Sequence, residues 1–367
     1  MARKQLENIG GKVNSVLNHR HDQAAHNGIG HEVLKDAKRQ QSHDHQHRCS
    51  AIKMLSQPEI RKRLSCFCAA IDRAALHSVN HPSPLPPPPV RAQPVTHYEN
   101  FPVASWLCPP ALRQPIAAIY AFARAADDIA DEGDASPQQR LEQLNSYRQA
   151  LHACAQGHVN SAWSDIFGPL QYNITQYALP VSLLDDLISA FIQDIEYTRD
   201  ARTYANRAQL LDYCSRSANP VGRLLLHLYG VHDQPSLERS DAICSALQLI
   251  NFWQDLSEDI PRGRHYLTDE DCATFGVTRQ DLAQMQVTPE IQQLIASNVD
   301  WARASMQKGS DLVHQLPGRI GWELRLVVQG GLCILNKVDA LQGRSLHTRR
   351  TVSAWDAPGM LWRAVRM

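Results

Sequence analysis

The sequence lacks any long run of hydrophobic residues. Across its 367 residues, no stretch approaches the about 18 consecutive apolar residues that a membrane-spanning helix needs. Residues 1–17 contain no continuous apolar segment of the kind found in signal peptides. We therefore expect a cytoplasmic protein that is soluble or in peripheral contact with the inner membrane.

Two further absences narrow the class of protein. None of the nine cysteines forms a CxxC pair, and their odd number leaves at least one thiol unpaired in any disulfide scheme, which favours a reducing compartment. The chain carries no net charge, but residues 1–96 are basic and the remainder is acidic. An acidic body lacks the clustered Lys and Arg that bind phosphate backbones, which argues against nucleic acid as the main partner.

Alternating apolar and polar residues, the signal for β-strands, are also absent. From residue 97 onward, apolar residues recur at helical spacing, as in Leu112, Ile116 and Ile119. We predict an all-α protein with about ten helices. Residues 1–96 are rich in His and basic residues and end in a proline run, so we predict a disordered extension, or translation from a start upstream of the native one. The predicted folded domain is residues 97–367.

The first informative motif is an acidic cluster at Asp127, Asp128 and Asp131. Small and apolar residues precede it on nearly every side of the predicted helix, which indicates a buried helix. Residues three or four apart share a helix face, so these carboxylates repel one another. A positive partner is needed to offset that repulsion.

A second acidic pair, Asp255 and Asp259, continues a polar stripe that begins with Gln248 and Asn251 on an otherwise apolar helix. Two opposed carboxylate stripes would hold Mg²⁺, which binds few carboxylates and completes its coordination with water and substrate phosphates. The alternative for each pair alone is a solvated helix face. Arg124 and Arg264 lie beside the two motifs, as surface ion-pair partners or as a clamp on a diphosphate.

Together these residues resemble the two aspartate-rich motifs of the squalene and phytoene synthase family. The resemblance extends from about residue 97 to the C-terminus and also rests on residues 213–214, 218–222, 248–251 and 263–267. A finer similarity, to the hydroxysqualene synthase branch of bacterial hopanoid biosynthesis, rests on residues 97–105, 251–255 and 353–356. Gln254 departs from the family, because many members have arginine just before the second motif.

The resemblance implies a single-domain helical bundle of the isoprenoid synthase type with a central cavity. It implies that two or three Mg²⁺ ions are bound by Asp127, Asp128, Asp131, Asp255 and Asp259. It further implies that Arg124, Arg264 and Tyr266 grip the diphosphate and that Gln248 and Asn251 orient the site. Tyr120 and Tyr213 would lie near the reacting carbons, Phe101 would line the prenyl cavity, and His97 and Asn100 would also contact substrate. By themselves, Phe101, Phe122, Phe252 and Trp253 are more often core residues.

The expected reaction is conversion of presqualene diphosphate to hydroxysqualene, with loss of diphosphate and no need for NADPH, in a pathway shared with hopanoid enzymes. One alternative is head-to-head condensation of two farnesyl or geranylgeranyl diphosphates to presqualene diphosphate, squalene or phytoene. Another is a non-catalytic helical lipid-binding protein. Residues 360–366 combine apolar and basic residues at helical spacing, which fits a membrane contact or, as we favour, a packed terminal helix.

Overall fold

The computed structural model describes residues 108–367, and this part of the chain contains helices and no strand. The all-α prediction is confirmed. The described residues all belong to one compact unit. The longer helices are α4 (Arg113–Asp131), α5 (Pro137–Ala155), α6 (Ser164–Tyr177), α7 (Val181–Arg199), α8 (Arg207–Ser217), α9 (Asn219–Leu228), α10 (Gln234–Gln254), α14 (Pro289–Gly309), α16 (Gly318–Ala340) and α17 (Ala357–Arg366).

Short helices connect these long ones. They are α11 (Leu256–Asp259), α12 (Asp269–Thr274), α13 (Arg279–Ala283) and α15 (Leu312–Gln315), with a 3₁₀ turn, η4 (Ile260–Arg262), after α11. Helix α5 begins with a capping box: the Ser136 side chain accepts the amide of Gln139, whose side chain accepts the amide of Ser136. In the part of the chain that is described, no helix is both long and apolar enough to cross a bilayer.

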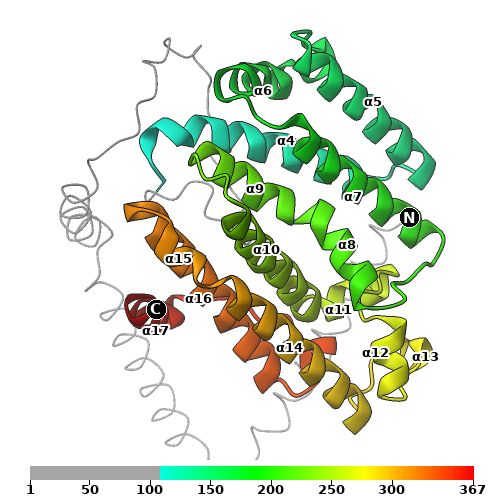
Figure 1. Ribbon diagram of the computed structural model, residues 1–367. Coiled ribbons are helices and arrows are strands. Elements are labelled where there is room, and N and C mark those ends of the chain that lie inside the picture. The colour runs from blue at the N-terminus through cyan, green and yellow to red at the C-terminus, as the bar shows by residue number, and fades with distance from the viewer. Residues whose placement is uncertain (1–107) are drawn as a thin grey trace, which may run out of the picture. The chain divides into compact units, whose positions relative to one another are not determined.

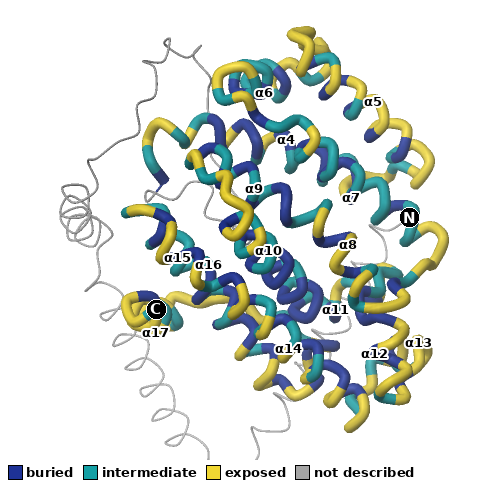
Figure 2. Tube along the Cα trace, in the orientation of Figure 1, coloured by how far each residue is buried: buried dark blue, intermediate teal, exposed yellow. Residues whose placement is uncertain are grey.

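Helix α10 lies at the centre of the described helices. It packs against α8, α9, α14 and α16, and most of its residues are buried (Figures 1 and 2). Gly309 permits α14 to approach α10 closely, because a Cβ at this position would lie 2.4 Å from the backbone oxygen of Arg239 on α10. The buried side chains form two hydrophobic clusters, one around α4 to α7 and the other around α10, α14 and α16, and α9 contributes to both.

The helix that carries the first acidic motif differs from the prediction of a helix buried on nearly all sides. Phe122, Ala126 and Ala130 of α4 are buried, but Ala117 and Ala121 are exposed. Of the three aspartates, Asp127 and Asp128 are partly buried and Asp131 is exposed. Alanine carries little apolar surface and tolerates either environment, so a run of alanines does not identify the buried side. The expected core positions of Phe122, Phe252 and Trp253 are confirmed, since each is at most 3 % exposed.

Candidate active site

The first acidic motif is balanced by an arginine on its own helix. Arg124 Nη1 lies 3.0 Å from Asp127 Oδ2, and its Nη2 lies 2.8 Å from Asp128 Oδ1 and 2.7 Å from Glu132 Oε1. The spacing of three and four residues along α4 makes the contacts with Asp127 and Asp128 possible. Burial, followed by repulsion from Asp131, raises the pKa of Asp127 to about 6.

The second acidic motif lies where α10 ends. Asp255 leaves the regular helix, with φ −102° and ψ 15°, and α11 then carries Asp259. Burial raises the pKa of Asp259 to about 7, and the charge of Asp255 adds to this effect. Gln248 and Asn251 lie on α10 before this break and are partly buried, so the predicted polar stripe ends at the second motif.

Arg264 brings the two motifs together. Gly263 adopts the left-handed conformation, with φ 77°, after η4, and the Arg264 amide donates to the Asp259 carbonyl at 2.9 Å. The guanidinium of Arg264 then donates to Asp131 on α4, 133 residues earlier in the chain. Although burial acts in the opposite direction, this hydrogen bond and the neighbouring acids raise the pKa of Arg264 above its usual range. The structure therefore places both motifs at one site.

A further carboxylate at this site, Asp194 of α7, was not predicted from the sequence. Its Oδ2 accepts a hydrogen bond of 2.6 Å from the Tyr213 hydroxyl. Burial raises the pKa of Asp194 to about 7, and the charges of Asp131 and Asp127 add to the effect. No spacing pattern links residue 194 to either motif, because its position depends on how α7 packs against α4 and α8.

An aromatic cluster surrounds the Tyr213 ring. Tyr213 is 3 % exposed and lies beside Tyr204 and Phe252, and Tyr266 stacks on Phe252 with ring centroids 3.7 Å apart. The Tyr266 side chain is 8 % exposed, and its ring contacts both Tyr213 and Phe252 in this cluster. Burial raises the pKa of both Tyr213 and Tyr266 well above the usual range.

Arg349, near the C-terminal end, is a second residue that the sequence analysis missed. Its Nε and Nη2 donate to the two carboxylate oxygens of Asp255, at 2.5 and 3.3 Å. The next residue is fixed as well, because the buried Gln254 side chain donates to the Arg350 carbonyl at 2.6 Å. At the position where many family members have arginine, Gln254 thus anchors a segment that brings a different arginine to the second motif.

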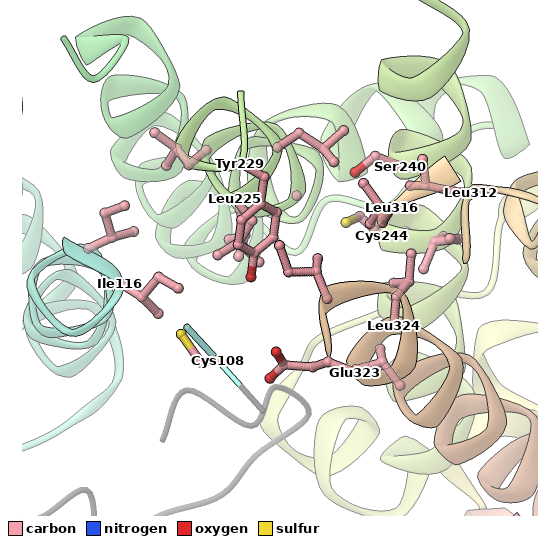
Figure 3. A pocket seen from close by; sticks show the side chains of 18 of the residues that line it. Cys108, Ile116, Leu225, Tyr229, Ser240, Cys244, Leu312, Leu316, Glu323 and Leu324 are labelled. Atoms are coloured by element: carbon pink, nitrogen blue, oxygen red, sulfur yellow. The ribbon is translucent and has the colours of Figure 1, made fainter. Parts of the chain in front are cut away.

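A cavity adjoins the acidic site. It offers about 210 Å³, compared with the about 15 Å³ that one water molecule requires on the same measure, so an extended ligand has room to enter. Helices α4, α9, α10, α15 and α16 contribute the lining, which is mainly Leu, Ile and Val (Figure 3). Tyr120 and Ala123 line it from the α4 face that also carries Asp127 and Asp131, since these residues follow one another at helical spacing.

The carboxylates suit a Mg²⁺ ion that also binds the phosphates of a substrate. No three His, Cys, Asp or Glu side chains among residues 108–367 are grouped as a closed site for an ion. Mg²⁺ does not require such a group, because it commonly takes one or two carboxylates together with substrate phosphates and waters. Asp128 Oδ1 is buried without a hydrogen bond and lies 2.8 Å from Arg124 Nη2, so a bound cation would share or replace this ion pair. The donor set therefore fits the metal.

Three of the predicted substrate residues, His97, Asn100 and Phe101, lie outside the described residues, as does the predicted extension at residues 1–96. The remaining predicted residues lie on α4, α8, α10, α11 and the segment after η4, except Asp255, which lies between α10 and α11.

Comparison with known proteins identifies the family. The family model for squalene/phytoene synthases matches residues 95–356. The chain belongs to the squalene/phytoene synthase family. A hydroxysqualene synthase of Zymomonas mobilis is 31 % identical over 260 residues, which cover 68 % of this chain and 83 % of that protein. A presqualene diphosphate synthase of Rhodopseudomonas palustris is 28 % identical over 64 % of this chain and 81 % of that protein.

The fold of this chain also resembles that of a solved squalene synthase. The crystal structure of a squalene synthase from Alicyclobacillus acidocaldarius superposes with a TM-score of 0.60 at 35 % identity, over 67 % of this chain and 90 % of that chain. The protein is thus an enzyme that processes prenyl diphosphates, and the alternative of a non-catalytic lipid-binding protein is not supported.

Proposed function

We propose that this squalene/phytoene synthase family enzyme converts presqualene diphosphate to hydroxysqualene and diphosphate. The main support is the junction of an acidic site, closed by the contact of Arg264 with Asp131, and an apolar cavity along the same face of α4. A diphosphate group would fit the acidic site, and a prenyl chain would fit the apolar cavity. Similarity to hydroxysqualene synthases favours this substrate over others of the family.

In this proposal, Asp127, Asp128, Asp131, Asp255 and Asp259 hold Mg²⁺. Bound Mg²⁺ would supply Lewis acidity that stabilises the departing diphosphate. Burial, with a smaller contribution from neighbouring carboxylates, raises the pKa values of Asp127 and Asp259, and a bound cation would favour their ionised forms.

Basic side chains at the acidic site would bind the substrate. Arg124 and Arg264 now donate to carboxylates, and each can direct an N–H group to a diphosphate oxygen instead. Gln248 and Asn251 would orient the same group from α10. Residues 97–367 would form the whole domain, with His97, Asn100 and Phe101 also at the substrate.

The cavity would protect the carbocation that remains after diphosphate leaves. Its walls are mainly aliphatic, and the aromatic ring of Tyr120 can stabilise positive charge through its π-face. Tyr213 and Tyr266, in the aromatic cluster, would act at the end nearest the acids. No nicotinamide is required, because the product forms by capture of water.

Product analysis tests the proposal directly. Purified protein is incubated with presqualene diphosphate and Mg²⁺, with and without NADPH, and a parallel reaction contains farnesyl diphosphate alone. Hydroxysqualene and diphosphate are expected from presqualene diphosphate in both NADPH conditions. Squalene formed only with NADPH, or consumption of farnesyl diphosphate alone, would show that the enzyme catalyses a different reaction of the family.

We also propose peripheral membrane contact through the C-terminal end. Helix α17 packs on α16, where Arg363 donates to Gln329 at 3.0 Å, yet Trp355, Trp362 and Val365 are 91 %, 61 % and 59 % exposed. Tryptophan favours the membrane interface. Replacing both Trp355 and Trp362 with Ser should weaken flotation with anionic vesicles about tenfold, whereas Leu211→Ser on α8 should not; equal flotation of all three proteins would exclude this surface.

A further inference from the structure

One charged side chain, Glu323, lines the otherwise apolar cavity among the described residues. It lies on α16 with Ile320, Leu324 and Val327, which also line the cavity, so their spacing defines one helix face. Glu323 is half-buried, and an ionised carboxylate on an apolar helix face loses part of its hydration. One of its oxygens, Oε2, is buried. A carboxylate kept on the apolar face of a helix indicates a chemical role more than a packing role.

Two polar side chains share the space that Glu323 enters. Figure 3 shows Glu323 reaching from α16 into the cavity, with Tyr229 and Cys108 on other sides of it. Burial raises the pKa of the Cys108 thiol to about 11, and the negative charge of Glu323 adds to this effect. Burial likewise raises the pKa of Tyr229 above its usual range, again with a contribution from Glu323. The charge of Glu323 acts on both the Cys108 thiol and the Tyr229 hydroxyl, which agrees with their shared position around the cavity.

A purely apolar cavity tends to remain dry, since a buried water needs about two to four polar partners. The Glu323 carboxylate accepts hydrogen bonds, and the Tyr229 hydroxyl can donate one. A water between them would donate to Glu323 and accept from Tyr229, which leaves one lone pair directed at the remaining space. That space is where the prenyl carbons of the substrate would lie.

We propose that Glu323 and Tyr229 hold the water that captures the rearranged carbocation, and that Glu323 accepts a proton from it. This inference rests on the proposed function. The water oxygen forms the new C–O bond with its free lone pair, one O–H bond breaks with its electrons remaining on oxygen, and the proton passes to the carboxylate. The products are the neutral alcohol and a neutral Glu323, which returns its proton to solvent when the product leaves.

The same carboxylate could instead remove a proton from a carbon next to the cation, which would give a triene-type hydrocarbon and no alcohol. The two roles predict opposite products in a variant without the carboxylate. Loss of a water-activating base lowers the share of alcohol and increases the share of hydrocarbon. Loss of a base that acts on carbon has the reverse effect.

The experiment uses the full chain with presqualene diphosphate, Mg²⁺ and ¹⁸O-labelled water. Wild type is compared with Glu323→Gln, which keeps the shape but cannot take up the proton, and with Glu323→Leu, which also removes the hydrogen bond. Asp339→Asn is the matched control, because Asp339 lies on the same helix with a side chain that is 56 % exposed and does not line the cavity. Diphosphate release and the fraction of labelled alcohol are measured separately.

We expect diphosphate release within about threefold of wild type in both Glu323 variants, while the labelled alcohol fraction falls at least about tenfold, as for loss of a general base. Asp339→Asn should match wild type in both measurements. A wild-type alcohol fraction in Glu323→Gln and Glu323→Leu would overturn the proposal. So would a parallel loss of diphosphate release and alcohol, because that result indicates a structural role. Failure of the proposed function is distinct, since the wild type itself would then form no alcohol.

Discussion

The two acidic motifs balance their charge in different ways. In the first, Arg124 lies one turn before the aspartates on an unbroken helix and contacts Asp127 and Asp128. In the second, the helix breaks at Asp255, and the balancing Arg349 lies 94 residues away in the chain. Local balance depends only on helix geometry, whereas distant balance requires the C-terminal segment to be folded in place. Asp127 and Asp128 therefore have a local positive partner, whereas Asp255, like Asp131 through its contact with Arg264, depends on tertiary structure for its partner.

The largest effect should come from removing one carboxylate from each motif. Asp128→Asn and Asp255→Asn are each expected to lower turnover at least about 10³-fold, because a metal position and its charge are lost. If the motifs form one site, the double variant should be no slower than the slower single variant, since residues that act as a unit are not additive. Turnover of presqualene diphosphate and helicity by circular dichroism are the measurements.

Asp165→Asn on α6, an acidic residue away from both motifs, is the control for loss of a charge. Its turnover should equal that of wild type. Wild-type rates in either motif variant would contradict a shared metal site, and multiplication of the two losses in the double variant would indicate two independent sites.

A smaller effect on kcat/KM should distinguish Arg349 from Arg124. Arg349→Ala is expected to lower kcat/KM about 10- to 100-fold, as for loss of a group that orients a metal ligand. Arg349→Lys should not restore activity, because an ammonium group cannot reproduce two parallel N–H contacts with one carboxylate. Arg124→Lys should retain more activity than Arg349→Lys, since Arg124 makes its contacts with separate side chains. Equal kinetics of the two lysine variants would remove the distinction between the motifs.

Raising the pH should modestly lower the stability of the metal-free protein. The pKa values of about 7 for Asp259 and Asp194 exceed that of an unfolded aspartate, which is about 4. Between these values the folded metal-free protein retains protons that the unfolded chain has lost, so its free energy of unfolding falls as pH rises. We expect Tm to decrease on the order of 2–4 °C between pH 5.5 and 8.

The Asp259→Asn variant should show a flatter decrease of Tm over the same range, because one titrating group is gone. Thermal unfolding of both metal-free proteins, followed by circular dichroism, provides the comparison. A wild-type Tm that rises steadily with pH, or identical slopes for the two proteins, would show that these carboxylates carry no such penalty.

Much of this arrangement could be predicted where neighbours in sequence are neighbours in space. Apolar periodicity predicted the helices, and spacing along α4 predicted the proximity of Arg124 to the aspartates. Asp194 and Arg349 could not be found in this way, because their positions depend on how α7 and the C-terminal segment pack. The exposure of the acidic face of α4 was also misjudged, since alanine gives no signal for either side.

The central claim is that the two motifs form one site, whose repulsion is relieved by Mg²⁺ and pyrophosphate acting together. Thermal unfolding at pH 8 with Mg²⁺ alone, inorganic pyrophosphate alone and both together tests this most directly. The account predicts a rise in Tm with both that exceeds the sum of the separate rises, and loss of this excess in Asp128→Asn and in Asp255→Asn. Additive rises in the wild type, or an excess that survives in either variant, would contradict it.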